Sequence, residues 1–215
     1  MRKLSFMVLI LALLTAIACK KDEINDDTPP DNTYIPKGYM QMKVGSYWIY
    51  QHFKINPNGS DSAYSTTDSV FISGTKTINN NTYYKFEIEG WTNSVMYYRD
   101  SLGNKVDTNG RIYMSEVSFN DTILTHTNSM GGNPIFHLAR IMYDSDSTID
   151  VPAGVFNNCI VAKSYVKLYI PTSGSNPYAD YDYYAKNIGL VQSSYRWSSS
   201  GQMWERRLLR YYIPQ

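Results

Sequence analysis

Cysteine and glutamate are scarce in this chain, and each scarcity excludes a class of structure. The 215 residues include two cysteines, Cys19 and Cys159, so the chain cannot be a small domain held together by a framework of disulfides. Glutamate occurs five times, whereas aspartate occurs fourteen times. Residues that favour helices are scarce, whereas tyrosine, threonine, isoleucine and valine, which favour β-strands, are plentiful. This composition predicts an all-β domain.

An excess of charge of either sign is also lacking. Lysine and arginine together number 20 against 19 aspartates and glutamates, which gives a formal net charge of +1 at pH 7. The sequence contains no basic stripe and no arginine-rich segment that could follow a phosphate backbone. We therefore expect no nucleic-acid partner.

Motifs for metal binding and catalysis are missing from the sequence. His52, His126 and His137 are far apart and belong to no spacing typical of a metal site. No Gly-x-Ser-x-Gly elbow occurs, and Cys159 has no acidic or histidine neighbour to activate it. We expect Cys159 to be a buried, inert thiol. We also expect the protein to have no metal, no cofactor and no enzymatic activity.

Two groups of acidic residues could still carry chemistry. Glu87 and Glu89 share one face of a predicted strand about 7 Å apart, a spacing that two catalytic carboxylates of a glycosidase could use. An exposed polar face of an amphipathic strand is the simpler interpretation. Asp144, Asp146 and Asp150 offer oxygens that suit calcium, but the glycine and the terminal glutamate of a calcium loop are missing. A solvated turn explains these three aspartates equally well.

The N-terminus has the pattern of a secretory signal peptide. Arg2 and Lys3 precede an apolar run at residues 4–14, and small residues lead up to Cys19. The run is too short to span a bilayer, and no stop-transfer pattern follows it. A cysteine in this place is where a bacterial lipoprotein signal is cut and acylated. We therefore interpret residues 1–18 as a lipoprotein signal peptide and expect acyl chains on Cys19 to anchor the protein to a membrane.

The residues on either side of Cys19 leave two cleavage routes open. Residues 16–18 (Ala-Ile-Ala) also fit an ordinary signal peptidase, and Ala16 stands where lipoprotein signals usually carry leucine. Cys19 is followed directly by Lys20, Lys21, Asp22 and Glu23. This run resembles the surface-export signal of lipoproteins from the Bacteroidota. The resemblance implies a lipid-anchored outer-membrane protein that faces the extracellular side.

The remainder of the chain divides into a tether and one folded domain. Residues 19–42 are polar and broken by prolines, so we interpret them as the lipidated cysteine and a flexible tether. Residues 43–215 contain ten to twelve strand-like runs separated by turn signals such as residues 56–59 (Asn-Pro-Asn-Gly). We expect a single all-β domain with a large curved antiparallel sheet, either a half-barrel or a sandwich. Residues 135–143 and part of residues 203–212 could be short helices or strands.

Two stretches of this predicted domain resemble a known group of proteins. Residues 44–50 (Val-Gly-Ser-Tyr-Trp-Ile-Tyr) resemble the domain opening of uncharacterised surface lipoproteins of the Bacteroidota. Residues 151–159 (Val-Pro-Ala-Gly-Val-Phe-Asn-Asn-Cys) and 183–191 (Tyr-Tyr-Ala-Lys-Asn-Ile-Gly-Leu-Val) resemble their closing signature. The resemblance implies a curved antiparallel sheet similar to that of the periplasmic lipoprotein carriers, which enclose an acyl chain between the sheet and helices.

Short triplets of aspartate, serine or threonine, and an apolar residue recur in the domain. They look like the O-glycosylation acceptor motif of exported Bacteroidota proteins. Ordinary turn chemistry ahead of a strand explains the same triplets. The candidate acceptors are Ser62, Ser69, Ser101 and Thr122.

The tyrosines suggest a sugar-binding strip. Tyr181, Tyr183 and Tyr184 could stack on sugar rings. The strand period places Tyr181 and Tyr183 on one face and Tyr184 on the other, so core packing or cross-strand pairing is the alternative.

We expect a surface-exposed binding or adhesion module for a glycan or a protein, which predicts an aromatic patch on an outer face. The rival is a carrier of a small hydrophobic or acyl ligand, which predicts a cavity with an apolar lining and few tyrosine hydroxyls.

Overall fold

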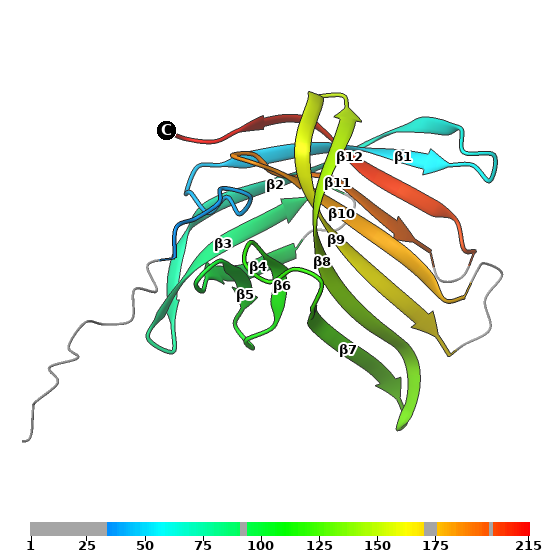
Figure 1. The fold of residues 1–215 in the computed structure, drawn as a ribbon, viewed down its shortest axis with the longest axis horizontal. Helices are drawn as coiled ribbons and strands as arrows, with labels where there is room; N and C mark the ends of the chain where they lie inside the picture. Colours follow the sequence, from blue (N-terminus) through cyan, green and yellow to red (C-terminus); the bar gives the residue numbers. More distant parts are fainter. Residues whose placement is uncertain (1–33, 91–93, 170–175, 198–199) are drawn as a thin grey trace, which may run out of the picture. The chain divides into compact units, whose positions relative to one another are not determined.

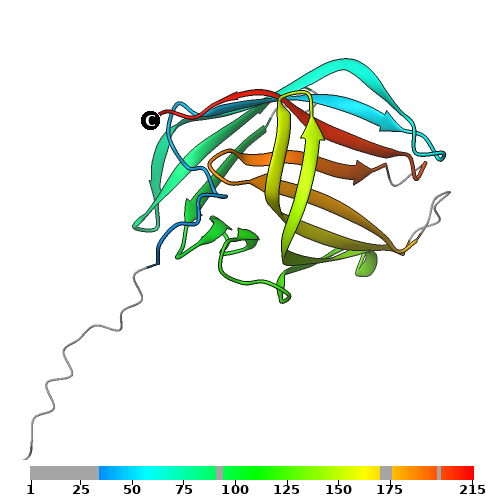
Figure 2. The same ribbon diagram turned by 45° about the horizontal axis from the view of Figure 1, so that its top comes forward.

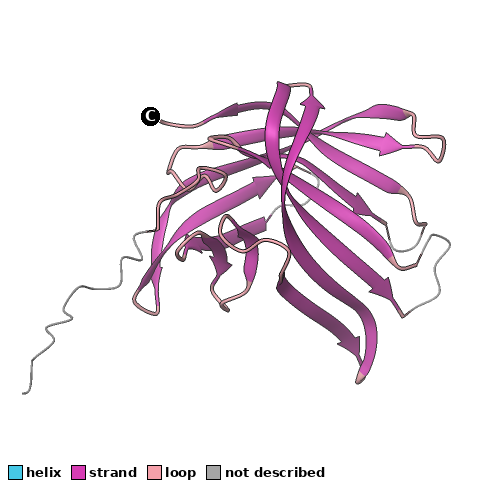
Figure 3. Cartoon of the chain, in the orientation of Figure 1, coloured by secondary structure: helices cyan, strands magenta, loops and turns pink. Residues whose placement is uncertain are grey.

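The computed structural model describes residues 34–90, 94–169, 176–197 and 200–215, and these form a single all-β domain without a helix (Figure 3). The all-β prediction is therefore confirmed. Among the described residues, no helix is long and apolar enough to cross a membrane. The twelve strands are β1 (Tyr47–Ile55), β2 (Asp61–Ile78), β3 (Asn81–Glu89), β4 (Ser94–Asp100), β5 (Asn104–Asp107), β6 (Ile112–Ser115), β7 (Thr122–Met130), β8 (Asn133–Val151), β9 (Gly154–Leu168), β10 (Tyr178–Ala185), β11 (Gly189–Arg196) and β12 (Met203–Tyr212).

All twelve strands belong to one antiparallel sheet. The spatial order is β6-β5-β4-β3-β2-β1-β12-β11-β10-β9-β8-β7. The chain therefore makes two meanders, β1 to β6 and β7 to β12, which are joined by the pairing of β1 with β12. In that pairing Trp48 lies opposite Tyr211. A single sheet excludes the sandwich alternative.

The sheet rolls up until its two edge strands, β6 and β7, approach each other (Figures 1 and 2). The Asn120 N–H, between these strands, donates a hydrogen bond of 2.8 Å to the carbonyl of Met142 in β8. The result is a nearly closed, barrel-like sheet, as the half-barrel alternative predicts. Strand twist and the bulges along long strands such as β8 permit this curvature.

Both segments that could have been helices are strands. Residues 135–143 belong to β8, which pairs with β7 on one side and β9 on the other. Residues 203–212 form β12, which pairs with β1 and β11. Neighbouring strands on both sides satisfy the backbone groups of each segment, and this tertiary context decides between the two structures.

The turn between β2 and β3 shows how local sequence sets the register. Asn79 and Asn80 have φ angles of 48° and 60°, and Ile78 lies opposite Asn81. A two-residue hairpin turn of this kind needs positive φ at both positions, which asparagine tolerates better than other residues with a side chain. Asn79 and Asn80 thus form the turn, and Asn81 begins β3.

Two clusters of buried side chains form the core. The larger is Trp48, Tyr50, Ile72, Phe86, Tyr98, Val151, Cys159, Ala185, Val191 and Leu208. The smaller is Met114, Met142, Ile160 and Ala162, with Tyr39 and Met40 packed against it. Because Tyr39 and Met40 precede the first strand, the segment before the sheet contributes to the core.

That segment, residues 34–42, is here named the strap. It was expected to be part of a flexible tether, but it packs against the sheet, so the folded unit begins at Tyr34 and not at residue 43. Its carbonyl at Gly38 accepts a hydrogen bond of 2.7 Å from Asn187 N–H in the β10–β11 turn. Tyr39 donates to the carbonyl of Asn158 in β9 at 3.0 Å. The rest of the predicted tether, residues 19–33, and the signal peptide lie outside the described residues.

Candidate functional site

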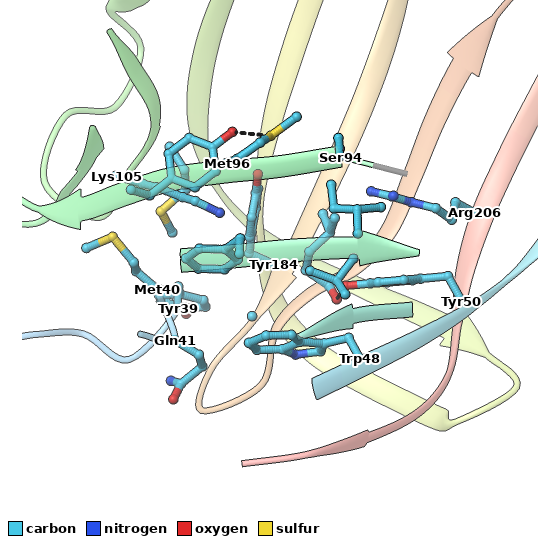
Figure 4. A pocket seen from close by; sticks show the side chains of 17 residues that line it. Tyr39, Met40, Gln41, Trp48, Tyr50, Ser94, Met96, Lys105, Tyr184 and Arg206 are labelled. Atoms are coloured by element: carbon cyan, nitrogen blue, oxygen red, sulfur yellow. Dashed lines mark hydrogen bonds between the residues drawn. The ribbon is translucent and has the colours of Figure 1, made fainter. Parts of the chain in front are cut away.

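The rolled sheet encloses a pocket of about 380 Å³ (Figure 4). Its wall is built by the strap, by β1 to β6 and by β10 to β12. Here it is named the interior pocket. Eight of the residues that line it are apolar, among them Trp48, Val70, Phe86, Ile88, Met96 and Met114. Four more are tyrosines, Tyr39, Tyr50, Tyr98 and Tyr184, so the lining carries more tyrosine hydroxyls than the carrier alternative predicts.

The period of two along each strand explains why these side chains converge. Phe86 and Ile88 of β3 both line the pocket, as do Met96 and Tyr98 of β4. The residues between them, such as Glu87, lie on the other face, since successive side chains of a strand point to opposite sides. Phe86 lies opposite Met96 in the ladder, so the two rows form one continuous wall.

The strap closes one part of the pocket. Tyr39, Met40 and Gln41 are all part of its lining. A fully buried carboxylate, Glu116, holds the strap in place by accepting hydrogen bonds from Lys37 N–H at 2.8 Å and from Met40 N–H. The pocket therefore depends on residues from before the first strand as well as on the sheet.

Several polar groups in the wall are already engaged within the protein. Trp48 Nε1 donates to the carbonyl of Ile188 at 2.7 Å, and the Tyr50 hydroxyl donates to the carbonyl of Leu190 at 2.9 Å. Burial raises the pKa of Tyr50 above its ordinary value. These contacts leave mainly the apolar surfaces of Trp48 and Tyr50 for the pocket.

Lys105 differs from the other polar residues of the wall. Its Nζ lies 4.4 Å from the Phe86 ring centroid and 4.3 Å from that of Tyr98. None of the described residues offers it an ion pair or a hydrogen bond. Burial is the main cause that lowers the pKa of Lys105 to about 8, and the positive charge of Arg140 contributes to the same shift. Figure 4 shows Lys105 and Arg206 reaching into the pocket from opposite sides.

Arg206 belongs to a chain of polar contacts that continues away from the pocket. Its guanidinium lies over the Tyr50 ring at 4.8 Å and 3.8 Å from Asp68 Oδ2. The same carboxylate oxygen lies 2.8 Å from His52 Nε2, and His52 Nδ1 lies 2.9 Å from the Tyr195 hydroxyl. Asp68 thus balances the charge of Arg206.

A second buried ion pair joins Arg140 of β8 to Asp182 of β10. Arg140 also donates to Ser164 Oγ at 3.1 Å and to the Tyr184 hydroxyl at 3.2 Å, while Ser193 donates to Asp182 at 2.5 Å. The Arg140 and Asp182 side chains are 13% and 19% exposed. Asp182 therefore balances Arg140, and several hydrogen bonds fix the pair.

Asp180 precedes Asp182 by two residues in β10, so the strand period places both on the same face, and Asp180 lies near Arg196. Burial raises the pKa of Asp180 to about 7, although the Arg196 charge opposes this. Its Oδ1 atom is buried without a hydrogen-bond partner. The interior beyond the apolar pocket is thus rich in charged groups.

The predicted sugar-binding tyrosines do not form one strip. Tyr181 and Tyr183 stack on each other with ring centroids 6.3 Å apart and an interplanar angle of 15°. Tyr184 points to the opposite face and lines the interior pocket (Figure 4). Lys163 Nζ lies over the rings of Tyr165 and Tyr181, at 4.6 and 5.5 Å. The face opposite the pocket thus carries an aromatic strip that includes Tyr165.

The candidate glycosylation acceptors lie in different environments. Ser62 and Thr122 are exposed, whereas Ser69 and Ser101 are half-buried. Their modification stays a prediction. Cys19 and the predicted export signal, Lys20 to Glu23, lie outside the described residues.

The acidic groups lie on strands. Glu87 pairs with Lys85 at 2.7 Å, which lowers the pKa of Glu87, and Glu89 is exposed. Asp144, Asp146 and Asp150 are exposed along β8. Among the described residues no three His, Cys, Asp or Glu side chains group closely enough to hold a metal ion.

The histidines and the described cysteine have ordinary packing roles. His126 packs edge-on against Phe136, with ring centroids 5.7 Å apart, and His137 Nδ1 lies 2.9 Å from the Thr127 hydroxyl. Cys159 is fully buried as predicted, and burial raises its thiol pKa to about 11.

Sequence reasoning missed Lys105, Arg140 and Arg206 as interior residues. A signal was present only on β10, where Asp180, Asp182 and Tyr184 alternate with Tyr181 and Tyr183. Nothing around Lys105 marks it as inward-facing: its immediate neighbours are Asn104 and Val106, and the strand period favours the apolar Val106, not Lys105, as the core residue.

Comparison with known proteins gives similarity at the level of the fold. No family model matches the chain, and no curated protein matches it. A candidate lipoprotein from Parabacteroides distasonis is 12% identical with a TM-score of 0.55, over 83% of this chain and 100% of that one. A candidate exported protein with a YmcC-like fold from Bacteroides fragilis is 14% identical with a TM-score of 0.52, over 82% and 99%. At these identities the likeness establishes a shared fold.

Proposed function

We propose that this chain is an exported, lipid-anchored protein whose domain binds a small, largely apolar ligand in the interior pocket. The observation that carries the proposal is the pocket of about 380 Å³ with its apolar wall and the strap across it. Pockets of this size and lining are typical of small-molecule sites. This is the carrier alternative, which the pocket favours over adhesion. The sheet and the strap build it, and no helix of the kind found in the periplasmic carriers lies among the described residues.

The test has an analytical arm and a mutational arm. The protein purified from its native membrane is denatured, and the released small molecules are identified by mass spectrometry. Binding of the neutral fluorescent probe N-phenyl-1-naphthylamine is then measured for Val70→Phe, which fills the pocket, and for Val95→Phe. Val95 lies on β4, where it is 49% exposed and does not line the pocket, so it serves as the matched control.

We expect Val70→Phe to weaken probe binding about tenfold, because it removes much of the free volume, and Val95→Phe to leave it unchanged. The absence of any copurifying apolar molecule together with equal probe binding by both variants contradicts the proposal.

Anchoring and location rest on the N-terminal sequence. The signal pattern ending at Cys19 supports acylation, and the run Lys20 to Glu23 supports export to the outer face of the outer membrane. That the two proteins with a similar fold are described as a candidate lipoprotein and a candidate exported protein agrees with this. Incorporation of labelled palmitate should disappear in Cys19→Ala. Protease added to intact cells should digest the protein, and should spare it when residues 20–23 are replaced by alanine.

The stacked pair Tyr181 and Tyr183 favours glycan binding as a second candidate function. Together with Tyr165 and Lys163 they form an aromatic strip on the face opposite the pocket. Aromatic side chains with one polar end are suited to contact a partner. If the strip binds a glycan, Tyr181→Ala with Tyr183→Ala abolishes glycan-array signals, while Val70→Phe keeps them. Unchanged signals in the double variant contradict this role.

A further inference from the structure

The charges in the wall of the interior pocket and next to it do not balance. Arg140 is paired with Asp182, and Arg206 lies near Asp68. Among the described residues, no carboxylate forms an ion pair with Lys105. The charge of Asp182 attracts Lys105 from a distance, but Asp182 already forms an ion pair with Arg140. The pocket therefore presents one excess positive charge, and that charge is on Lys105.

The position of this charge is unusual for a lysine. A lysine beside an apolar wall normally extends its ammonium group into water. Lys105 instead lies on β5 opposite Met114, with its Nζ over the rings of both Phe86 and Tyr98. The two rings attract the cation but accept no conventional hydrogen bond from it. All three N–H donors of the ammonium group are thus available to a molecule that enters the pocket.

We propose that the interior pocket binds an amphipathic anion, whose apolar part lies against Trp48 and Met114 and whose anionic group binds Lys105 Nζ. This inference rests on the proposed function, because it names the class of ligand that the same pocket takes. Carboxylate and phosphate head groups share the required chemistry, since both accept charge-assisted hydrogen bonds from an ammonium group. A neutral apolar molecule would leave the Lys105 charge without a partner beside its own apolar part.

The test compares ligands that have the same tail and different heads. Decanoate, decyl phosphate, decanol and decylamine are titrated into the purified full-length protein at about pH 7 by calorimetry. We expect one or both anions to bind at least about tenfold more tightly than decanol, the effect of one charge-assisted hydrogen bond, and decylamine to bind most weakly. The ratio of decanoate to decyl phosphate affinity distinguishes a free carboxylate from a phosphate head.

Variants test whether the preference for anions over decanol depends on Lys105. Lys105→Met keeps the length of the side chain, so decanol should still bind within about twofold, while the preference for anions disappears. Lys105→Arg should keep the preference. Lys76→Met is the matched control, because Lys76 also lies over a tyrosine ring, Tyr97 at 5.4 Å, but on an exposed part of β2. Thermal unfolding of each variant confirms that it is folded.

Raising the pH gives an independent readout. The groups that act on Lys105 are Arg140 of β8, Asp182 of β10 and Arg206 of β12. The low pKa of the Lys105 ammonium predicts that the anion preference weakens by about pH 9.5 in the wild-type protein, and that Lys105→Arg retains it.

The possible results separate the two proposals. Equal binding of anions and decanol by the wild-type protein overturns the assignment of Lys105 and leaves the apolar pocket intact. Tighter binding of decylamine than of the anions also overturns it. Failure of every ligand to bind counts against the proposed function itself.

Discussion

The hydroxyl of Tyr34 donates a hydrogen bond of 2.6 Å to the buried carboxylate of Glu116, and so joins two residues that are 82 positions apart. Glu116 follows β6 at one edge of the sheet, and Tyr34 is the first residue of the strap. The same carboxylate accepts hydrogen bonds from the backbone N–H groups of Lys37 and Met40. One side chain therefore satisfies three donors of a segment with no regular structure.

The first prediction concerns this carboxylate. Glu116→Ala should lower the free energy of unfolding by about 1.5–3 kcal/mol, because backbone N–H groups of the strap lose a charged acceptor. Trypsin should also cleave faster at Lys37. Glu89→Ala, at an exposed position, is the control and should change neither quantity. Unchanged cleavage at Lys37 would show that Glu116 does not hold the strap.

The second prediction concerns the buried pair of Arg140 and Asp182. Asp182→Ala should lower the free energy of unfolding by about 3–5 kcal/mol, because it leaves a buried guanidinium without its partner. The double variant Arg140→Met, Asp182→Leu should recover most of the loss, since it removes both charges. Urea unfolding measures both. A double variant no more stable than Asp182→Ala contradicts this account.

The third prediction is a pH dependence caused by Lys105. Its pKa in the folded protein, about 8, lies below that of the unfolded chain. Between about pH 8 and pH 10.5 the unfolded state binds more protons, so stability should rise with pH in this window. Lys105→Met should remove the rise and stabilise the protein at pH 7 by about 1–3 kcal/mol, since it removes a desolvated charge. A variant less stable than wild type at pH 7 would contradict the desolvation argument.

The fourth prediction is a pH dependence of stability caused by Asp180, opposite in direction to that caused by Lys105. The pKa of Asp180 is raised by burial to about 7 in the folded protein. Between about pH 4 and pH 7 the folded state binds more protons, so stability should fall as the pH rises through this window. Asp180→Asn should flatten the profile by about 1–2 kcal/mol, a reduced value because the side chain is only half-buried. Melting curves across the window measure it, and an identical profile in the variant refutes the assignment.

The fifth prediction compares two adjacent leucines of β12. Leu208 is fully buried in the larger core cluster, whereas Leu209 is 36% exposed. Leu208→Ala should cost about 2–5 kcal/mol through lost burial and the cavity it leaves. Leu209→Ala should cost about 0.5 kcal/mol or less. Similar losses at both positions would mean that β12 is packed differently from the structure described.

Local features of the fold were predictable from the sequence. The turn at Asn79 and Asn80, the alternation of Tyr181, Tyr183 and Tyr184, and the burial of Cys159 all follow from short-range rules that the sequence shows directly. Each depends on backbone preference or on the period of a strand.

The interior pocket could not be predicted in the same way. The pocket forms only because β1 pairs with β12, which lies more than 140 residues further along the chain. It also requires one sheet that rolls up on itself instead of two sheets packed face to face. Lys105 lies beside the apolar Val106 in the short strand β5, and its inward orientation follows only from its register opposite Met114. The strap was misassigned because its polar composition resembles a tether, and its partner Glu116 is distant in the sequence.

The strap also has a mechanical consequence. Within the described residues, tension applied at Tyr34 acts first on the hydrogen bond from Tyr34 to Glu116 and then on the other bonds of the strap. Met40, which lies in the wall of the pocket, is one of the residues held by those bonds. A pull at Tyr34 therefore loads the strap's part of the pocket wall before it loads β1.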